Sequence, residues 1–408
     1  RLNLVTVDLG DTSQQVVCGG SNVAADMMIA FARSGSVVTG RDGEPFTLGK
    51  VTIRGVESEG MICAGQELGL AHLLPCSGKE VSDLREWNGA PGQSLAELIG
   101  YQDHILEIDN KSLTNRPDLW GHHGIARELA ALYQLPLKEL PRFDVPTDQG
   151  SIAIEISDTE RCGRYSCTSI SDVDARPAPT WMRSRLCRVG QRPINGLVDL
   201  TNYVMMATGQ PSHAFDARDV QEGIQVRRAE SGERMTLLDQ NELTLSDDDL
   251  VIASGSPAAL AGVMGGELGV REDTQDLVLE VASFSPVPIR RTARTYHLRT
   301  ESSARFEKGL DTQRVDVALG VRRAIVRGLT RPRPPGKSAC SSVCCSRPCC
   351  SSTPSGCPCS TLSSTPSRPR APRARPAAAA RGAGGGVGQR PRLLRRRRHL
   401  CVHAAARV

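Results

Sequence analysis

A carboxylate lies inside one of the most apolar segments of this chain. Glu280 stands in segment 277–282, and in a strand its side chain would share a face with Val278 and Ala282. An ionised carboxylate on such a face requires a hydrogen-bond donor, because burial of an unpaired charge is strongly unfavourable. The donor is either an arginine, for which Arg192 is a candidate, or the hydroxyl group of a bound ligand. Glu280 is therefore a candidate for recognition of a ligand hydroxyl.

A histidine and a turn of small residues supply further groups suited to ligand binding. His213 lies in a short loop after Pro211, although a single histidine is more often an ordinary surface or core residue. Gly262 and Gly265 lie in a turn where the lack of side chains lets the backbone approach a ligand closely. The sequence contains no Ser-His-Asp order and no metal-water motif. Hydrolysis at such a site would depend on positioning a water molecule and a carbonyl group.

Two helices are expected directly before the histidine loop. One covers about 179–188 and the second about 198–207. Asn202 shares a face of the second helix with Val198 and Met205. An amide on an apolar face costs stability unless it is hydrogen-bonded. Asn202 is therefore either a buried asparagine bonded to nearby backbone or a group that faces a ligand.

Residues 1–100 are expected to form a small all-β unit. Short β-branched runs separated by Gly, Asn and Asp turns favour a barrel of about five strands over a helical array. These runs contain Val5, Val7, Val16, Val17, Val37, Val38, Val51 and Ile53. Lys50 and Arg54 are either candidate phosphate contacts or charges on a solvated face.

Charge divides the chain near residue 330. Residues 331–408 hold 16 basic residues and no acidic one, which leaves 34 of the 50 basic residues and all 45 acidic ones in the preceding part. The net charge of +5 and the pI of 8.6 therefore combine an acidic globular part with a basic tail. The tail lacks periodicity and is expected to be disordered. Its composition is typical of GC-rich coding sequence out of frame, so a frameshift after about residue 329 is our leading explanation.

Cysteine usage and hydropathy favour a cytosolic protein. Six cysteines precede the tail, and their scattered positions indicate reduced, packed thiols. No apolar run reaches the ~18 residues that a membrane span needs, and no signal peptide opens the chain. The chain begins at Arg1 within a strand-like alternation, so we expect a truncated N-terminus.

Several longer motifs resemble one protein family. The motifs are IRGVESEGMICAGQELGL at 53–70, the segment 103–137, QPSHAFD at 210–216, LAGVMGGE at 260–267 and RTESSARFEKG at 299–309. Together they resemble the bacterial phenylalanine-tRNA ligase β subunit. The resemblance implies a multidomain α+β fold, in which an OB-type β-barrel tRNA-binding domain precedes an α+β editing domain and a disordered C-terminal tail.

The resemblance also implies domain boundaries. They are an OB-fold tRNA-binding domain at 1–100, the remainder of an interrupted structural domain at 101–154, the editing domain at 155–312, the start of a connecting helix at 313–329 and the tail at 330–408.

The family's editing pocket hydrolyses tyrosine attached to tRNA(Phe). A site built for phenylalanine rejects one added hydroxyl by only about a hundredfold, so a second site that binds this hydroxyl is needed. The resemblance assigns substrate binding to Glu280, Asn202, Pro211, Ala261, Gly262, Gly265 and Ser302. It assigns catalysis by positioning to His213, Thr300 and Arg192. Ser302 stands where the family usually has alanine.

The expected partners are tRNA(Phe) and, for an intact chain, the ligase α subunit in an α2β2 tetramer in the cytoplasm, with no membrane contact. The complete family enzyme uses ATP and magnesium at sites outside the family-like part of this chain. No cofactor is therefore expected on this chain, and the chain alone is not expected to aminoacylate tRNA. The alternative hypothesis is a non-catalytic RNA-binding fragment without a working editing pocket.

Overall fold

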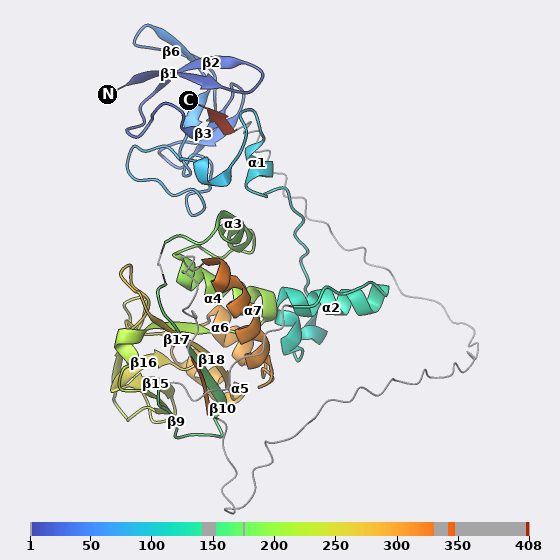
Figure 1. Ribbon diagram of the computed structural model, residues 1–408, viewed down its shortest axis with the longest axis vertical. Helices are drawn as coiled ribbons and strands as arrows, with labels where there is room; N and C mark the ends of the chain where they lie inside the picture. Colours follow the sequence, from blue (N-terminus) through green and yellow to red (C-terminus); the bar gives the residue numbers. More distant parts are fainter. Residues whose placement is uncertain (1, 141–151, 174–175, 330–341, 347–404, 408) are drawn as a thin grey trace, which may run out of the picture. The chain divides into compact units, whose positions relative to one another are not determined.

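The computed structural model describes residues 2–140, 152–173, 176–329, 342–346 and 405–407 (Figure 1). These residues belong to one compact unit that covers 1–348 and 398–408. Among them, no helix is both long enough and apolar enough to cross a lipid bilayer.

The first part of the chain consists of short strands. β1 (Asn3–Asp8) and β2 (Ser13–Cys18) pair antiparallel and extend into a five-stranded sheet of order β2-β1-β20-β3-β8. Val7, Ile29 and Phe31 are fully buried in its core. The other strands of this part are β3 (Met28–Ala32), β4 (Val37–Thr39), β5 (Pro45–Thr47), β6 (Lys50–Ile53), β7 (Val56–Glu59), β8 (Met61–Cys63) and β20 (Ala405–Arg407).

The predicted barrel of about five strands is not closed among the described strands, and residues 85–98 add two short helices to the unit that was expected to be all-β. The hairpins β4-β5 and β6-β7 remain separate two-stranded sheets. Between β2 and β7, the Val17 amide donates to the Ser58 hydroxyl at 3.0 Å, and the Gln14 side-chain amide donates to the Glu59 carbonyl at 2.6 Å. Side-chain hydrogen bonds therefore replace the backbone ladder that would close the sheet.

Short helices follow this sheet. α1 spans Leu95–Leu98 and α2 spans His122–Tyr133, and 3-10 turns lie at Arg85–Trp87, Lys111–Leu113 and Pro117–Trp120.

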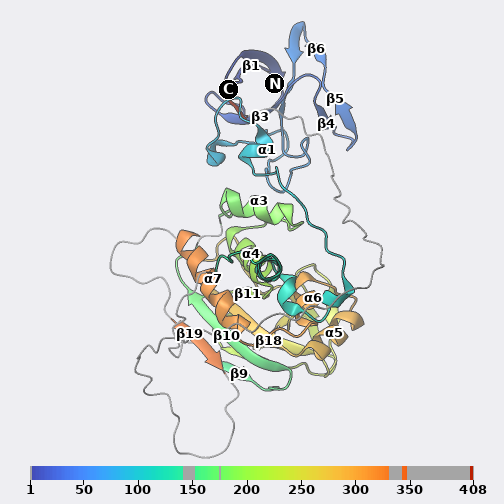
Figure 2. The same cartoon turned by 90° about the vertical axis from the view of Figure 1, so that its right-hand side faces the viewer.

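A strand that is buried along its whole length organises the second part of the chain. β18 (Leu277–Phe284) lies between β11 (His213–Asp216) and β10 (Cys162–Ile170), and both pairings are antiparallel. Three helices pack on the face of β18 that carries Val281, and α7 runs alongside this sheet (Figure 2). They are α3 (Thr180–Arg188), α4 (Gly196–Thr208) and α7 (Arg314–Leu329).

The opposite face of this sheet packs against a second sheet of order β17-β16-β15-β12-β9. Tyr165, Phe215 and Ile252 lie in the apolar core that the two sheets share. The mixed arrangement is the α+β fold expected for this part. The remaining elements are β9 (Ile154–Ile156), the 3-10 turn Ala217–Val220, β12 (Ile224–Arg228), β13 (Arg234–Thr236), β14 (Glu242–Thr244), β15 (Leu250–Ser254), β16 (Ser256–Leu260), β17 (Met264–Gly265), α5 (Pro286–Thr295) and α6 (Glu301–Phe306).

Local sequence signals account for the ends of α4. The Asn195 side chain accepts hydrogen bonds from the amides of Leu197 and Val198, at 3.1 and 3.0 Å, and so caps the N-terminus. Gly209 ends the helix at φ +79°, a conformation that glycine adopts without steric cost. The helices predicted at 179–188 and 198–207 are therefore confirmed to within two residues at each end.

The tail prediction falls mostly on 330–341, 347–404 and 408, which lie outside the described residues. Residues 342–346 form β19 against β10, and residues 405–407 form β20 between β1 and β3. The expectation of a wholly disordered tail is therefore wrong at these two segments. Strand pairing uses backbone groups, at the edge of the sheet for β19 and between two strands for β20, so it requires no particular side-chain pattern.

Asp199 gives the fold a testable pH dependence. Its side chain is buried, one oxygen accepts the Ile194 amide at 2.8 Å, and desolvation raises the pKa of the carboxyl to about 6. A folded-state pKa above the unfolded value means that this contribution to stability is complete below about pH 4 and is lost as the pH rises to about 6. We expect the urea-unfolding free energy to fall over this interval, and to fall less in Asp199→Asn. An identical slope in the variant would contradict this assignment.

Candidate active site

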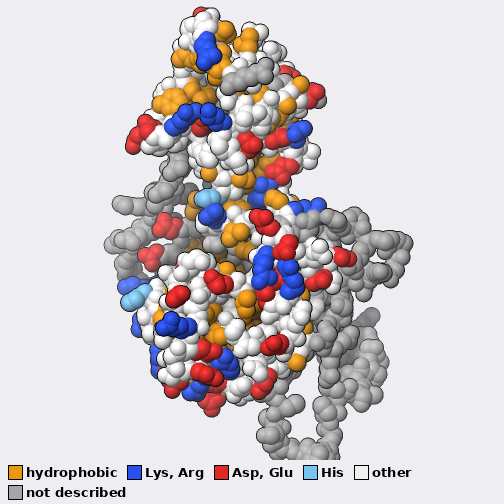
Figure 3. Space-filling view, turned by 90° about the vertical axis from the view of Figure 1, so that its left-hand side faces the viewer, with side chains coloured by type: hydrophobic (Ala, Val, Ile, Leu, Met, Phe, Trp, Pro, Cys, Tyr) orange, Lys and Arg blue, Asp and Glu red, His pale blue; other side chains and the backbone are white. Residues whose placement is uncertain are grey.

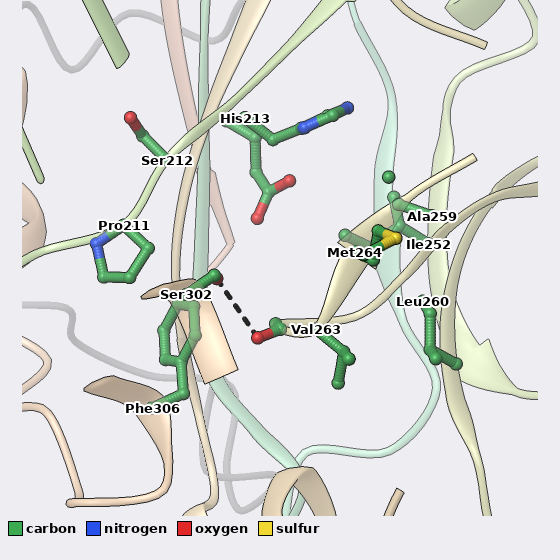
Figure 4. A pocket seen from close by; sticks show the side chains of 13 residues that line it. Pro211, Ser212, His213, Ile252, Ala259, Leu260, Val263, Met264, Ser302 and Phe306 are labelled. Carbon is green, nitrogen blue, oxygen red and sulfur yellow. Dashed lines mark hydrogen bonds between the residues drawn. The ribbon is translucent and has the colours of Figure 1, made fainter. Parts of the chain in front are cut away.

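A pocket with a volume of about 100 Å³ opens between the two sheets, beside the start of β11. Figure 4 shows Pro211, Ser212 and His213 along one side of it, and Ser302 and Phe306 of α6 along another. The other lining residues come from β15, from the segment 259–265 and from β18; they are Ile252, Ala259, Leu260, Gly262, Val263, Met264, Gly265 and Glu280.

Glu280 is the acidic residue of this pocket. Its side chain is 4% exposed, so the predicted burial of this carboxylate is confirmed. On β18 it stands opposite His213 of β11 on one side and Cys167 of β10 on the other. Paired residues of antiparallel strands project to the same face of a sheet. The carboxylate, the imidazole and the thiol therefore share the face that turns toward the second sheet.

The negative charge of Glu280 raises the pKa values of two buried neighbours. Burial raises the pKa of the Tyr165 phenol well above its usual value, and the negative charge of Glu280 raises it further. Burial raises the pKa of the Cys162 thiol to about 12, again with a contribution from Glu280. Both groups remain protonated at neutral pH, so neither acts as a base or a thiolate nucleophile.

The imidazole of His213 is held between an aromatic ring and a glycine. Its ring lies 4.5 Å from the Phe215 ring, centroid to centroid, at an interplanar angle of 71°. A Cβ atom added to Gly265 would lie 2.6 Å from Cε1 and 3.3 Å from Nε2 of this imidazole. Gly265 is therefore needed because the histidine ring occupies the space of a side chain.

The turn after β16 is tied to α6 by two hydroxyl groups. The Thr300 hydroxyl donates to the Val263 carbonyl at 2.7 Å, and the Ser302 hydroxyl donates to the Gly262 carbonyl at 3.1 Å (dashed line in Figure 4). Thr300 also caps α6, since it accepts the Ser303 amide at 3.0 Å. Both hydroxyls donate hydrogen bonds to backbone carbonyl oxygens and so fix the position of the turn.

The expected site residues are only partly brought together. Glu280, His213, Pro211, Gly262, Gly265 and Ser302 line the pocket, whereas Thr300, Ala261, Arg192 and Asn202 do not. Ala261 is buried between two lining residues, and Thr300 supports the turn from behind.

Arg192 and Asn202 do not line this pocket, and their assigned roles stay predictions. Arg192 is exposed in the loop before α4, so it is not the donor expected for Glu280. Asn202 is half-buried on α4, and α4 packs on the face of β18 opposite to Glu280. Helical periodicity identified the face of Asn202 but could not determine which side of the sheet the helix covers.

Gln210 is a supporting residue that the sequence did not single out. Its side chain is fully buried, and Nε2 donates to the Ala282 carbonyl at 2.9 Å and to the Pro211 carbonyl at 3.1 Å. These bonds attach the loop before His213 to β18. The sequence offered a signal for this supporting role, because Gln210 stands between the helix-ending Gly209 and Pro211.

The two basic residues predicted to bind phosphate lie on the β6-β7 hairpin. Lys50 is exposed, and its Nζ atom lies 2.9 Å from Glu57, whose hydrogen bond raises the pKa of the lysine. Arg54 is exposed in the turn at φ +50°. Figure 3 shows acidic and basic side chains interspersed over the visible face, without a broad basic field. Phosphate binding by these two residues stays a prediction.

Metal binding finds no support in the side-chain arrangement. Within the described part of the chain, no three His, Cys, Asp or Glu side chains are arranged to hold a metal ion.

Two family models match this sequence. One, described as a putative tRNA binding domain, matches residues 1–83, and the other, described as a B3/4 domain, matches residues 161–327. The second match contains the whole pocket described above.

Curated relatives share the sequence over most of its length. The phenylalanine-tRNA ligase beta subunit of Gloeobacter violaceus is 41% identical over 331 residues, which are 78% of this chain and 40% of the relative. The subunits of Latilactobacillus sakei and Staphylococcus aureus are each 38% identical, over 81% and 78% of this chain. This chain spans about 40% of the length of these relatives.

Proposed function

Because this chain is homologous to phenylalanine-tRNA ligase beta subunits over 78% of its length, we propose that it binds tRNA(Phe) and removes wrongly attached tyrosine from it. The observation that carries this proposal is the buried pairing of Glu280 with His213 across β11 and β18, at the wall of a small pocket. The pocket offers one anionic acceptor among mostly apolar lining residues.

Glu280 selects the substrate in this proposal. The phenol hydroxyl of a tyrosyl ester donates a hydrogen bond to the carboxylate, which is buried at the pocket wall. Phenylalanine lacks this hydroxyl and would cover the carboxylate without donating to it. A tyrosyl ester therefore gains a hydrogen bond to a buried charge that phenylalanine cannot make, so the pocket favours tyrosine over phenylalanine.

Positioning drives the hydrolysis in this proposal. Water adds to the ester carbonyl carbon, the bond to the ribose oxygen breaks, and tyrosine and the tRNA hydroxyl are released. The hydroxyls of Thr300 and Ser302 donate to backbone carbonyls, so neither is a free nucleophile. The imidazole of His213 then orients the water or the ester carbonyl, and the glycine turn brings backbone close to the substrate.

The proposal also covers tRNA binding and the place of this chain in a complete ligase. Lys50 and Arg54 contact tRNA phosphates, and a chain with the full length of its relatives joins an α subunit in an α2β2 enzyme that uses ATP and magnesium. The carboxylates and nucleotide site for that chemistry are assigned to parts of the ligase beyond this chain.

Deacylation tests the proposed function directly. The purified chain is mixed with tRNA(Phe) carrying radiolabelled tyrosine or phenylalanine, and release of each amino acid is followed. We expect faster release of tyrosine. Binding of tRNA with no deacylation above the rate in buffer would instead support the non-catalytic RNA-binding alternative.

His213→Ala is expected to slow the release of tyrosine by about tenfold to a hundredfold, because a positioning group is lost. The ratio of tyrosine to phenylalanine release should stay the same, since Glu280 and not His213 recognises the phenol hydroxyl. Single-turnover rates for both esters measure this. A variant that loses the tyrosine preference at an unchanged rate would require the two roles to be exchanged.

A further inference from the structure

A second hollow, of about 300 Å³, lies between α2, α3 and α4. Its wall includes Arg185 and Arg188 of α3 together with Tyr203 and Met206 of α4. Because α3 and α4 pack on the Val281 face of β18, the sheet separates this hollow from Glu280. Neither the editing pocket nor the phosphate contacts proposed on β6-β7 include any of these residues.

Aromatic rings and a guanidinium group form one cluster at the edge of this hollow. The Trp181 and Tyr203 rings lie 5.3 Å apart in an edge-on arrangement at 87°. The guanidinium carbon of Arg185 lies 5.2 Å from the centre of the Trp181 ring, and Arg185 donates to the Tyr203 hydroxyl at 2.9 Å. Arg185 and Trp181 are both exposed, so a cation and a flat ring are presented to solvent side by side.

The hollow combines an apolar floor with polar groups at its rim. Leu186 is fully buried beneath it, and Val189, Met206 and Ala207 add apolar surface. At the rim, Arg188 donates to Asp103 at 2.5 Å, so its charge is shared with a carboxylate. Nδ1 of His122 is hydrogen-bonded to the Met206 carbonyl at 2.9 Å, which leaves Arg185 as the cation best placed for an anion.

We propose that this hollow binds an unpaired nucleotide of RNA. The planar base lies on the apolar floor against the Tyr203 ring, and the phosphate meets the Arg185 guanidinium. Base stacking on aromatic side chains and guanidinium contacts to phosphate are the two interactions that single-stranded RNA sites combine. Trp181 outside the hollow offers a second flat surface for the neighbouring base. The proposal concerns RNA, but it does not depend on ester hydrolysis at Glu280.

Binding of a short oligonucleotide to the full chain tests the site. The probe is fluorescein-labelled hexauridylate, which carries no amino acid and therefore reports nothing about deacylation. We expect Arg185→Ala and Tyr203→Ala each to weaken binding at least fivefold by fluorescence anisotropy. Tyr203→Phe keeps the ring and should weaken it less than twofold. Arg234→Ala is the matched control, because it removes an equal charge from an exposed position on β13.

Tryptophan fluorescence adds a local readout. The chain has three tryptophans, and Trp87→Phe with Trp120→Phe leaves Trp181 as the only one. We expect hexauridylate to quench Trp181 emission, and the quenching to disappear in Tyr203→Ala while the melting temperature is retained. Equal weakening by Arg234→Ala and Arg185→Ala, unchanged binding by Tyr203→Ala, or binding without quenching would each overturn the proposal.

Discussion

Glu280→Ala is expected to abolish the preference for tyrosyl over phenylalanyl esters. The variant removes the acceptor of the phenol hydroxyl, and it also removes the buried charge next to which a phenylalanine ring would lie. Release of tyrosine should therefore fall, release of phenylalanine should stay the same or rise, and their ratio should drop by about a hundredfold or more. Single-turnover deacylation of both charged tRNA(Phe) species measures the ratio.

Two further variants make this result specific. Glu280→Gln keeps an acceptor oxygen without the charge, so an intermediate ratio is expected. Glu267→Ala removes an equal charge from an exposed position in the turn after β17, and it should leave the ratio unchanged. An unaltered ratio in a folded Glu280→Ala protein would refute the assignment of this carboxylate to recognition of the phenol.

Gly265→Ala is expected to reduce the deacylation rate by about a hundredfold, because a small displacement of a positioning group has effects of this size. The new Cβ atom would lie 2.6 Å from the His213 ring and 3.0 Å from Leu238 Cδ1. The imidazole therefore has to move, and the Phe215 ring beside it restricts the directions that are open. The crystal structure of the variant would show the new position of the ring.

Gly269→Ala is the matched control for this change. It adds the same methyl group four residues further along the chain, where no atom beyond the two neighbouring residues lies within 4 Å of the position of its Cβ. We expect wild-type deacylation rates and a nearly unchanged melting temperature for this protein. Equal loss of activity in the two variants would mean that the conformation of segment 265–269, and not the position of His213, controls the rate.

Local patterns in the sequence determined the elements of the site. Strand alternation placed Glu280 on the face of Val278 and Ala282, and the structure buries it there. Helical spacing and the glycines that follow each segment placed the helices at 179–188 and 198–207. Motif similarity identified the family, and the relatives confirm it at about 40% identity. These features depend on neighbours in the sequence, so they can be deduced without a fold.

Only the tertiary structure decided which of these residues meet. Strand register sets His213 beside Glu280, and the packing of α4 on the other face of β18 removes Asn202 from the pocket. Arg192 has the charge that Glu280 would need, yet the loop before α4 exposes it to solvent. The direction of the Ser302 hydroxyl depends on the Gly262 carbonyl, which another part of the chain supplies. Contacts between distant segments depend on strand register and on the sheet face that each helix covers. Neither property can be deduced from local periodicity.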